Sequence, residues 1–183
     1  MTYAEILCLA VLEIGMPRAQ YACDNMETVI EAAEQNDVRP ELIISMIHYE
    51  SNWNPNVISR ANACGLTQVI PKFTGNKKVG TKKLTCKQLL NPRTSILTGT
   101  KILAYWMHKK YARKRAKEKL ALCSYLDGYR CVRIPRSKAG LRYARKIQRY
   151  AKRIKKMTVF VEDCIRSRHD DEDEMYEETG CTC

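Results

Sequence analysis

Glu50 is the residue whose surroundings in the sequence best suit proton-transfer chemistry. The apolar residues Ile43, Met46 and Ile47 precede it by seven, four and three positions, which puts its carboxyl group on the apolar face of a predicted helix. Burial and the carbonyl dipoles of a helix C-terminus both disfavour the anion, so we expect a raised pKa. A carboxylic acid that keeps its proton near neutral pH can protonate a leaving oxygen. The alternative is an ordinary glutamate in the last turn of a helix.

The elements that must position Glu50 are mostly helices. Pro40 is well placed as a first helical residue, and it opens the predicted helix that carries Glu50. Residues 51–92 are rich in Asn, Gly, Pro, Ser and Thr and lack sustained periodicity, which predicts a loop-rich lobe with a short hairpin around Gly75 to Gly80. The other predicted helices run from Met26 to Ala33, Ile96 to Met107, Leu120 to Leu126 and Tyr143 to Met157. The fold class is therefore mainly α, with a loop-rich lobe beside a helical lobe.

The charge of the chain is unevenly distributed. Residues 1–71 carry a net charge of −6, residues 72–161 carry +25 and residues 162–183 carry −7, within a total of +12. The basic segment favours polyanions such as nucleic acid, anionic cell-wall polymers or acidic lipid head groups, although solvated helix faces rich in Lys and Arg would give the same count. The last segment, with an acid-rich stretch from Asp170 to Glu178, is typical of a disordered or partner-bound tail.

The nine cysteines indicate disulfides and an oxidising compartment. They include no Cys-x-x-Cys pair and the three histidines do not cluster with them, so we expect no zinc site and no cofactor. The pairs favoured by their local setting are Cys123 with Cys131, which would close a short loop, and Cys64 with Cys86, which would hold an irregular region together. The odd number leaves at least one thiol free or paired with another chain.

No segment of the sequence reaches the roughly 20 apolar residues of a membrane span, so a soluble protein is expected. Residues 6–16 are apolar, yet Glu5 precedes them, Glu13 interrupts them and no basic residue occurs before Arg18, which makes a poor signal peptide. If the target lies in the periplasm or cell wall, delivery would then require a holin-type lesion, a specialised secretion machine or a phage virion.

Several strings in order resemble the catalytic domain of the soluble lytic transglycosylases, which belongs to the lysozyme-like superfamily. The resemblance covers about residues 26–155 and implies a lysozyme-like α+β fold. The matching strings are Glu50-Ser51 with Asn54-Pro55 and Ser59, Gly65-Leu66-Thr67-Gln68-Val69-Ile70-Pro71, Asn91-Pro92 with Ile96 and Gly99, Leu122-Cys123-Ser124-Tyr125-Leu126-Asp127-Gly128, and Tyr143-Ala144-Arg145-Lys146-Ile147.

Three residues depart from the pattern of this family. Thr67 stands where Met is usual, which would alter the floor of a sugar subsite. Leu126 replaces the usual Asn beside Tyr125 and so removes one polar substrate contact. Asp127 stands where a small residue is usual, and it is the obvious candidate for a second catalytic carboxylate, because Glu118 is the only other acid between Lys72 and Val161.

The resemblance implies cleavage of the β-1,4 bond between N-acetylmuramic acid and N-acetylglucosamine in peptidoglycan, with formation of a 1,6-anhydro product. Glu50 would be the catalytic acid and then the base, since residues 51–71 contain no Asp or Glu that could act as a partner. Ser59, Gln68, Tyr125 and Tyr143 would bind the glycan strand. Each has a simpler interpretation, as a turn serine, a surface amide or core aromatics.

The predicted organisation is an N-terminal extension (residues 1–25), a lytic transglycosylase-like catalytic domain (26–160) and an acidic, Cys-containing tail (161–183). The extension and the tail are candidates for contacts with virion or secretion-machine proteins. Two other functions compete with the transglycosylase interpretation. One is a hydrolytic muramidase of the same fold that uses Asp127, and the other is a basic nucleic-acid-binding or virion structural protein, as aromatics such as Tyr105, Trp106 and Tyr111 among the basic residues indicate.

Overall fold

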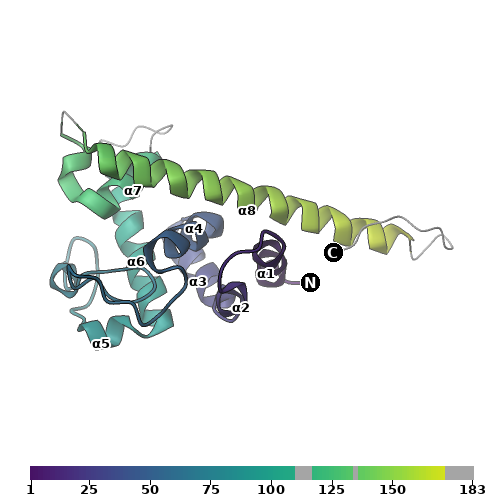
Figure 1. Cartoon of the computed structure of the whole chain (residues 1–183), viewed down its shortest axis with the longest axis horizontal. Coiled ribbons are helices and arrows are strands. Elements are labelled where there is room, and N and C mark those ends of the chain that lie inside the picture. Colours follow the sequence, from purple (N-terminus) through teal and green to yellow (C-terminus); the bar gives the residue numbers. More distant parts are fainter. Residues whose placement is uncertain (110–116, 134–135, 172–183) are drawn as a thin grey trace.

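A computed structural model describes residues 1–109, 117–133 and 136–171, with side chains through residue 167. The long helix α8 runs along the molecule, α1, α4 and α7 lie against it, and the loop-rich lobe lies at one end (Figure 1). The elements are α1 (Tyr3–Glu13), α2 (Ala19–Cys23), α3 (Met26–Asn36), α4 (Pro40–Ser51), η1 (Pro71–Phe73), α5 (Cys86–Leu89), α6 (Pro92–Met107), α7 (Lys117–Asp127), η3 (Gly128–Cys131) and α8 (Lys138–Asp171). This mainly α architecture confirms the predicted fold class.

The helix boundaries follow from local sequence signals. Pro40 and Pro92 occupy first-turn positions, where a missing N–H costs nothing. The side chain of Asn91 accepts a hydrogen bond from the N–H of Thr94 and caps α6. Helix α4 ends at Asn52, which adopts left-handed backbone angles. The five helices predicted from apolar periodicity are all present.

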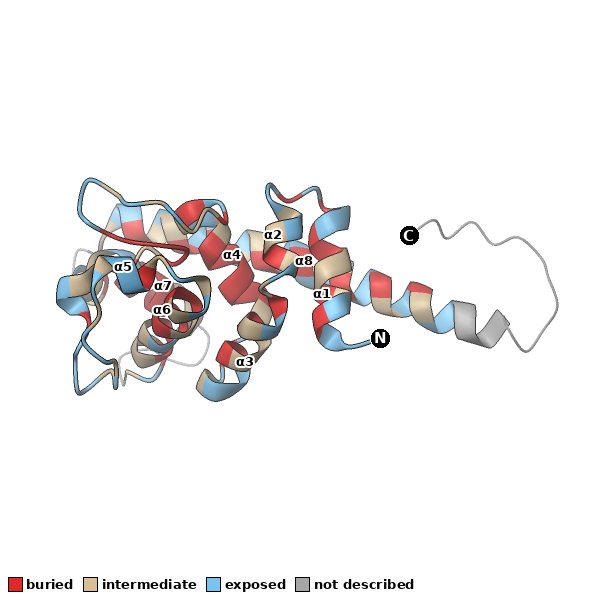
Figure 2. Cartoon of the chain, turned by 90° about the horizontal axis from the view of Figure 1, so that it is seen from below, coloured by how far each residue is buried: buried red, intermediate tan, exposed pale blue. Residues whose placement is uncertain are grey.

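The core is formed by the apolar faces of these helices. Ile43, Met46 and Ile47 of α4 are fully buried, as are Ile147 and Ile154 of α8. Figure 2 shows buried residues concentrated in α4 and on the faces that the helices turn toward one another. Burial of such side chains stabilises the fold by about 1.5 to 3 kcal/mol each, so this body is stabilised mainly by apolar contacts.

The first 25 residues pack onto the same core. Leu7 and Val11 of α1 are fully buried, and the guanidinium of Arg153 on α8 donates a hydrogen bond to the carbonyl of Ile14 at 3.1 Å. A disulfide between Cys8 and Cys23 joins α1 to α2 and was not predicted from the sequence. The division at residue 25 stays a prediction.

Helix α8 continues beyond the predicted end of the catalytic domain. Val161 and Cys164 are 1% and 4% exposed, because they extend the apolar face that includes Ile154 and Thr158. The expectation of a disordered or partner-bound tail from Glu162 onward is therefore wrong for residues 162–167, and the backbone of α8 continues as helix to Asp171. The acid-rich stretch beyond them lies outside the described residues.

The loop-rich lobe contains no hairpin around Gly75 to Gly80, so that prediction is wrong. The segment is a loop in which the N–H of Gly75 donates to the carbonyl of Lys82 at 3.0 Å and that of Gly80 to Asn76 at 2.9 Å. Within the described ranges, β structure is limited to isolated bridges in which Cys64 pairs with Ile58 and with Val69. The described part of the expected lysozyme-like α+β fold therefore consists of helices and loops, with these bridges as its β structure.

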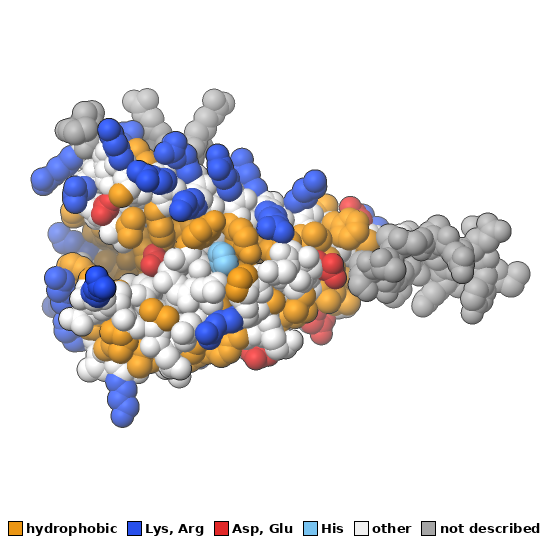
Figure 3. All heavy atoms as spheres, viewed as in Figure 1, with side chains coloured by type: hydrophobic (Ala, Val, Ile, Leu, Met, Phe, Trp, Pro, Cys, Tyr) orange, Lys and Arg blue, Asp and Glu red, His pale blue; other side chains and the backbone are white. Residues whose placement is uncertain are grey.

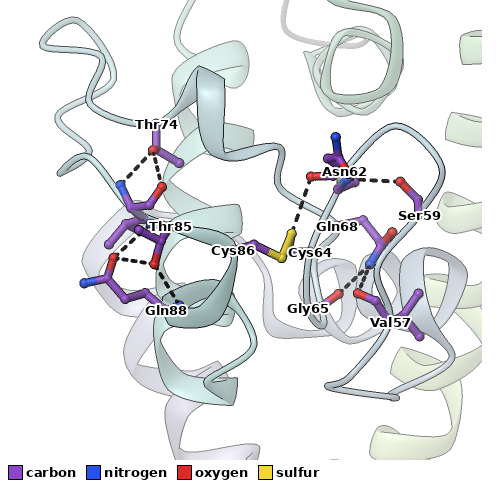
Figure 4. The surroundings of a disulfide bond; sticks show 12 residues. Val57, Ser59, Asn62, Cys64, Gly65, Gln68, Thr74, Thr85, Cys86 and Gln88 are labelled. Carbon is purple, nitrogen blue, oxygen red and sulfur yellow. Dashed lines mark hydrogen bonds between the residues drawn. A yellow bond between two sulfur atoms is a disulfide. The ribbon is translucent and has the colours of Figure 1, made fainter.

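Disulfides and polar contacts hold the loop-rich lobe together. The predicted bond between Cys64 and Cys86 is confirmed, and it joins the loop to α5 (Figure 4). The hydroxyl of Thr74 donates to the carbonyl of Pro71 at 2.6 Å and accepts from the N–H of Leu84 at 2.9 Å.

In the helical body, the predicted bond between Cys123 and Cys131 is also confirmed, and it joins α7 to η3.

Candidate active site

Glu50 lies in the last turn of α4, where the chain turns sharply into the loop-rich lobe. Asn52 and Trp53 follow it with φ of +51° and +58°, a left-handed conformation that costs energy in residues other than glycine. Trp53 is fully buried, and its packing holds this turn in place. The carboxyl group of Glu50 is thus fixed at the boundary between the helical body and the lobe.

Tyr143 on α8 contacts this carboxyl group directly. Its hydroxyl donates a short hydrogen bond to Oε1 of Glu50, across 93 positions of sequence. Burial raises the pKa of Glu50 to about 7, and the hydrogen bond from Tyr143 opposes that rise only in part. Burial and the adjacent carboxylate raise the pKa of Tyr143 well above its usual value, so its hydroxyl stays protonated and remains a donor.

Tyr125 on α7 is the second aromatic residue beside Glu50. Its hydroxyl donates to the backbone carbonyl of Thr67 at 2.7 Å, which joins the helical body to the loop-rich lobe. Burial, and then the charge of the nearby Glu50, raise the pKa of Tyr125. The structure therefore brings Glu50, Tyr125 and Tyr143 together.

Thr67 supports this arrangement from the lobe side, a role that the sequence analysis missed. Its side chain is fully buried against α6, where its hydroxyl donates to the carbonyl of Ser95 at 2.8 Å and its N–H donates to the Ser95 hydroxyl at 3.1 Å. A Cβ on Gly99 would lie 2.4 Å from the Thr67 Cβ. The expectation that the Thr67 side chain alters the floor of a sugar subsite is wrong, because that side chain packs against α6. A lone glycine inside an apolar helix was the available signal for such a close approach.

Ser59 and Gln68 brace the loop itself. The Ser59 hydroxyl accepts a hydrogen bond from the N–H of Ala63 at 3.0 Å. The amide of Gln68 donates to the carbonyls of Val57 at 3.1 Å and Gly65 at 2.9 Å (Figure 4). Among the described contacts, neither side chain is hydrogen-bonded to Glu50. Both residues keep one polar function for a ligand, the hydroxyl proton of Ser59 and the amide oxygen of Gln68.

Asp127, the candidate second carboxylate, takes part in a different contact. Its Oδ2 accepts a short hydrogen bond from the hydroxyl of Ser137, whose oxygen accepts in turn from the N–H of Gly140 at 3.0 Å. This chain of contacts ties the end of α7 to the beginning of α8. The neighbouring Leu126 is 46% exposed.

The surface around the loop-rich lobe has the shape of a groove. Figure 3 shows it hollowed where the beginning of α8 faces this lobe, with hydrophobic side chains inside the hollow and an acidic side chain at its edge. Among the residues that the structure describes, no cluster of His, Cys, Asp and Glu has the arrangement of a metal site. No described helix is long and apolar enough to cross a membrane. An acid that holds its proton near pH 7, two tyrosines and a groove can bind and cleave an acid-sensitive bond.

A family model for the transglycosylase SLT domain matches residues 27–148, two thirds of the chain. The chain belongs to the transglycosylase SLT domain family. The match includes α3, α4, the loop-rich lobe, α6, α7 and the first third of α8, and hence every residue of the candidate site.

Curated relatives of this SLT domain are membrane-bound lytic murein transglycosylases. One of type C from Actinobacillus pleuropneumoniae serotype 5b (strain L20) is 35% identical over 80 residues, which are 42% of this chain and 22% of the relative. Another of type C, from Histophilus somni (strain 2336), is 38% identical over 77 residues, 40% of this chain and 21% of the relative. One of type E from Buchnera aphidicola is 28% identical over 111 residues, 56% and 49% of the two chains. The chain thus spans less than half the length of these relatives.

Proposed function

We propose that this SLT domain is a peptidoglycan lytic transglycosylase that cleaves the β-1,4 bond between N-acetylmuramic acid and N-acetylglucosamine. The observation that carries the proposal is the Glu50 carboxyl group, whose pKa is raised to about 7 by burial at a groove and which accepts a hydrogen bond from Tyr143. Such a group is a proton donor and a proton acceptor in the same pH range. The printed names of the relatives support the same activity.

The proposed reaction uses Glu50 twice. Its proton passes to the glycosidic oxygen as the bond from this oxygen to C1 of N-acetylmuramic acid breaks. The resulting carboxylate takes the proton of the C6 hydroxyl of the same sugar, and O6 bonds to C1 to give the 1,6-anhydro product. The acid form of Glu50 is restored, and water is neither consumed nor released. The N-acetyl group of the substrate would stabilise the cationic centre.

The residues around Glu50 have proposed roles that match their contacts. Tyr143 holds the carboxyl group in one orientation and moderates its pKa. Tyr125 fixes the loop-rich lobe against the helical body, and its ring would offer an apolar face to a sugar. Ser59 and Gln68 offer their remaining polar functions to the N-acetyl and hydroxyl groups of the glycan strand.

Digestion of purified sacculi followed by mass spectrometry tests this function. The unmodified chain should release anhydromuropeptides, each lighter by one water than the hydrolysed product. Glu50→Gln should lower the cleavage rate at least about a hundredfold, because the acid is lost while the shape is kept. Glu34→Gln, at an exposed acid on α3, is the matched control and should cleave normally. Cleavage by Glu50→Gln at the normal rate would refute the assignment.

Hydrolysis with Asp127 as a second carboxylate is the alternative reaction. The hydrogen bond from Ser137 gives Asp127 a role in joining α7 to α8, which disfavours this alternative. Asp127→Asn should therefore keep the anhydro product. Exclusively hydrated product from the unmodified chain, lost in Asp127→Asn, would instead establish a muramidase.

A second candidate function, contact with a polyanion, rests on the basic surface of α8. Nine Lys and Arg lie between Lys138 and Lys156, with no acid before Glu162. They form a row along the helix (Figure 3). Binding to DNA or an anionic wall polymer should weaken steeply with salt and survive Glu50→Gln. Action in the periplasm or cell wall follows from the proposed substrate, whereas delivery by a virion or a secretion machine stays a prediction.

A further inference from the structure

Three aromatic side chains form a cluster beside the candidate active site. The rings of His48 and Tyr150 are stacked, with centroids 4.5 Å apart and planes at 10°. Tyr49 meets both rings edge-on, at 5.2 Å from His48 and 6.0 Å from Tyr150. The cluster therefore joins α4 to α8 by ring contacts of favourable geometry.

Along α8, this aromatic cluster is next to the contact between Tyr143 and Glu50. Tyr49 is adjacent to Glu50 in the chain, and Tyr150 follows Tyr143 by seven positions. Seven residues are two helical turns, so Tyr143 and Tyr150 lie on one side of α8 and about 10 Å apart, which is the length of a disaccharide. Figure 3 shows a band of hydrophobic side chains that continues from the hollow along the edge of α8, below the row of Lys and Arg.

The cluster is more exposed than packing between two helices requires. Tyr49 is 41% exposed, and His48 and Tyr150 are partly exposed. Nδ1 of His48 is buried and has no hydrogen-bond partner among the described residues, so the ring contributes to the cluster mainly by packing. Burial lowers the pKa of His48, so its ring is neutral at physiological pH. Neutral rings that combine apolar faces with the hydroxyl groups of two tyrosines suit the C–H faces and hydroxyls of a sugar.

We propose that Tyr49, His48 and Tyr150 form a distal saccharide subsite, which binds the glycan strand about one disaccharide away from the bond at Glu50. This inference rests on the proposed function, since the occupant is the continuation of the strand in the groove. The subsite would make affinity depend on chain length, because only a strand long enough to extend along α8 reaches it.

Binding of β-1,4-linked N-acetylglucosamine oligomers to the Glu50→Gln chain tests the subsite without cleavage. Calorimetry should show that a long oligomer binds more tightly than one that covers only the sugars next to Glu50. Tyr49→Ala should weaken binding of the long oligomer by about threefold to tenfold, the value of one aromatic contact, and leave the short one unchanged. Tyr49→Phe, which keeps the ring, should bind nearly normally.

Tyr129→Ala is the matched control, at a tyrosine 54% exposed on η3. It should bind both oligomers normally, and circular dichroism at the assay temperature should show that every variant is folded, because Tyr49 and Tyr129 each lose ring contacts when truncated. The subsite is overturned if length gives no gain in affinity, if Tyr49→Ala binds the long oligomer normally, or if it weakens the short one equally. Sacculus cleavage by the unmodified chain reports separately on the proposed function.

Discussion

The helical body and the loop-rich lobe are stabilised by different interactions. The body, which consists of α1 to α4 and α6 to α8, is held by buried apolar side chains such as Leu42, Leu103 and Ile147. Apart from Trp53 and Leu66, which are buried in the core of the body, the lobe (residues 51–92) has a small apolar cluster of Cys64, Val69 and Leu89, together with a disulfide and hydrogen bonds to backbone groups. A segment with so little apolar burial depends on covalent and polar contacts to keep one conformation.

The candidate site lies where these two regions meet. The body supplies Glu50, Tyr125 and Tyr143 on helices, where packing fixes side-chain positions to within narrow limits. The lobe supplies the carbonyl of Thr67, which Tyr125 binds, and the polar groups of Gln68. The proton donor is thus fixed by helix packing, whereas the opposite wall of the groove is fixed by a disulfide and hydrogen bonds. Separate perturbation of the two regions tests this contrast.

The largest effect is expected from Ile147→Ala in the helical body. Ile147 is fully buried, and its truncation leaves a cavity that should cost about 3 to 4 kcal/mol of unfolding free energy. Urea denaturation should show a single transition, in which lobe and body unfold together, at a lower urea concentration than in the unmodified chain. Val159→Ala, at a residue 41% exposed on the same helix, is the control and should change stability by less than about 0.5 kcal/mol. Equal effects of the two changes would mean that the buried face of α8 contributes no more to stability than its exposed face.

Loss of the bond between Cys64 and Cys86 should affect the lobe alone. The bond closes a loop of 22 positions, for which chain entropy predicts about 3 kcal/mol. In Cys64→Ala with Cys86→Ala, hydrogen exchange should accelerate in residues 51–92 and stay slow in α4 and α8. The double change Cys8→Ala with Cys23→Ala is the control, and its faster exchange should be confined to α1 and α2. Uniform acceleration across the molecule would mean that the lobe exchanges only by global unfolding and does not open separately from the body.

Glu50 itself should make stability depend on pH. Its pKa rises from 4.5 in the unfolded chain to about 7 in the fold, so the native state binds the proton more tightly. The native state is therefore most stable below pH 4.5, and it loses up to about 3 kcal/mol of unfolding free energy as pH rises from 4.5 through about 7. The difference in unfolding free energy between the unmodified chain and Glu50→Gln should change by this amount between pH 4 and pH 8. A constant difference across that range would show that the carboxyl group is not desolvated.

The sequence predicted most of the body because helical periodicity is a local signal. Apolar spacing placed Glu50 on the inner face of α4, and the lack of such spacing in residues 51–92 indicated a loop stapled by Cys64 and Cys86. Beyond residue 160 the predicted end of the packed helix was wrong. The spacing of Thr158, Val161 and Cys164 continues the buried face of α8, although the acidic Glu162 and Asp163 lie between them.

Contacts between distant segments could not be predicted in this way. The hydrogen bond from Tyr143 to Glu50 and the packing of Thr67 against Gly99 depend on how helices and loop meet in space. Periodicity specifies which face of an element is buried, and it does not specify the partner of each side chain. The family resemblance named Tyr143 and Gln68 as site residues, yet their hydrogen bonds follow only from the three-dimensional arrangement.

The smallest effect is expected from Tyr125→Phe, which removes one hydrogen bond between body and lobe. The Tyr125 hydroxyl is 2.7 Å from the carbonyl of Thr67, so its loss should cost about 1 kcal/mol of unfolding free energy. Hydrogen exchange should rise most at residues 65–70, because that part of the lobe is no longer tied to α7. Tyr129→Phe, at an exposed ring, should leave exchange there unchanged. If exchange in Tyr125→Phe stayed as slow as in the unmodified chain, the contacts of Thr67 with Ser95 and Gly99 would be sufficient to hold this part of the lobe, and the Tyr125 hydroxyl would not be needed to join the two regions.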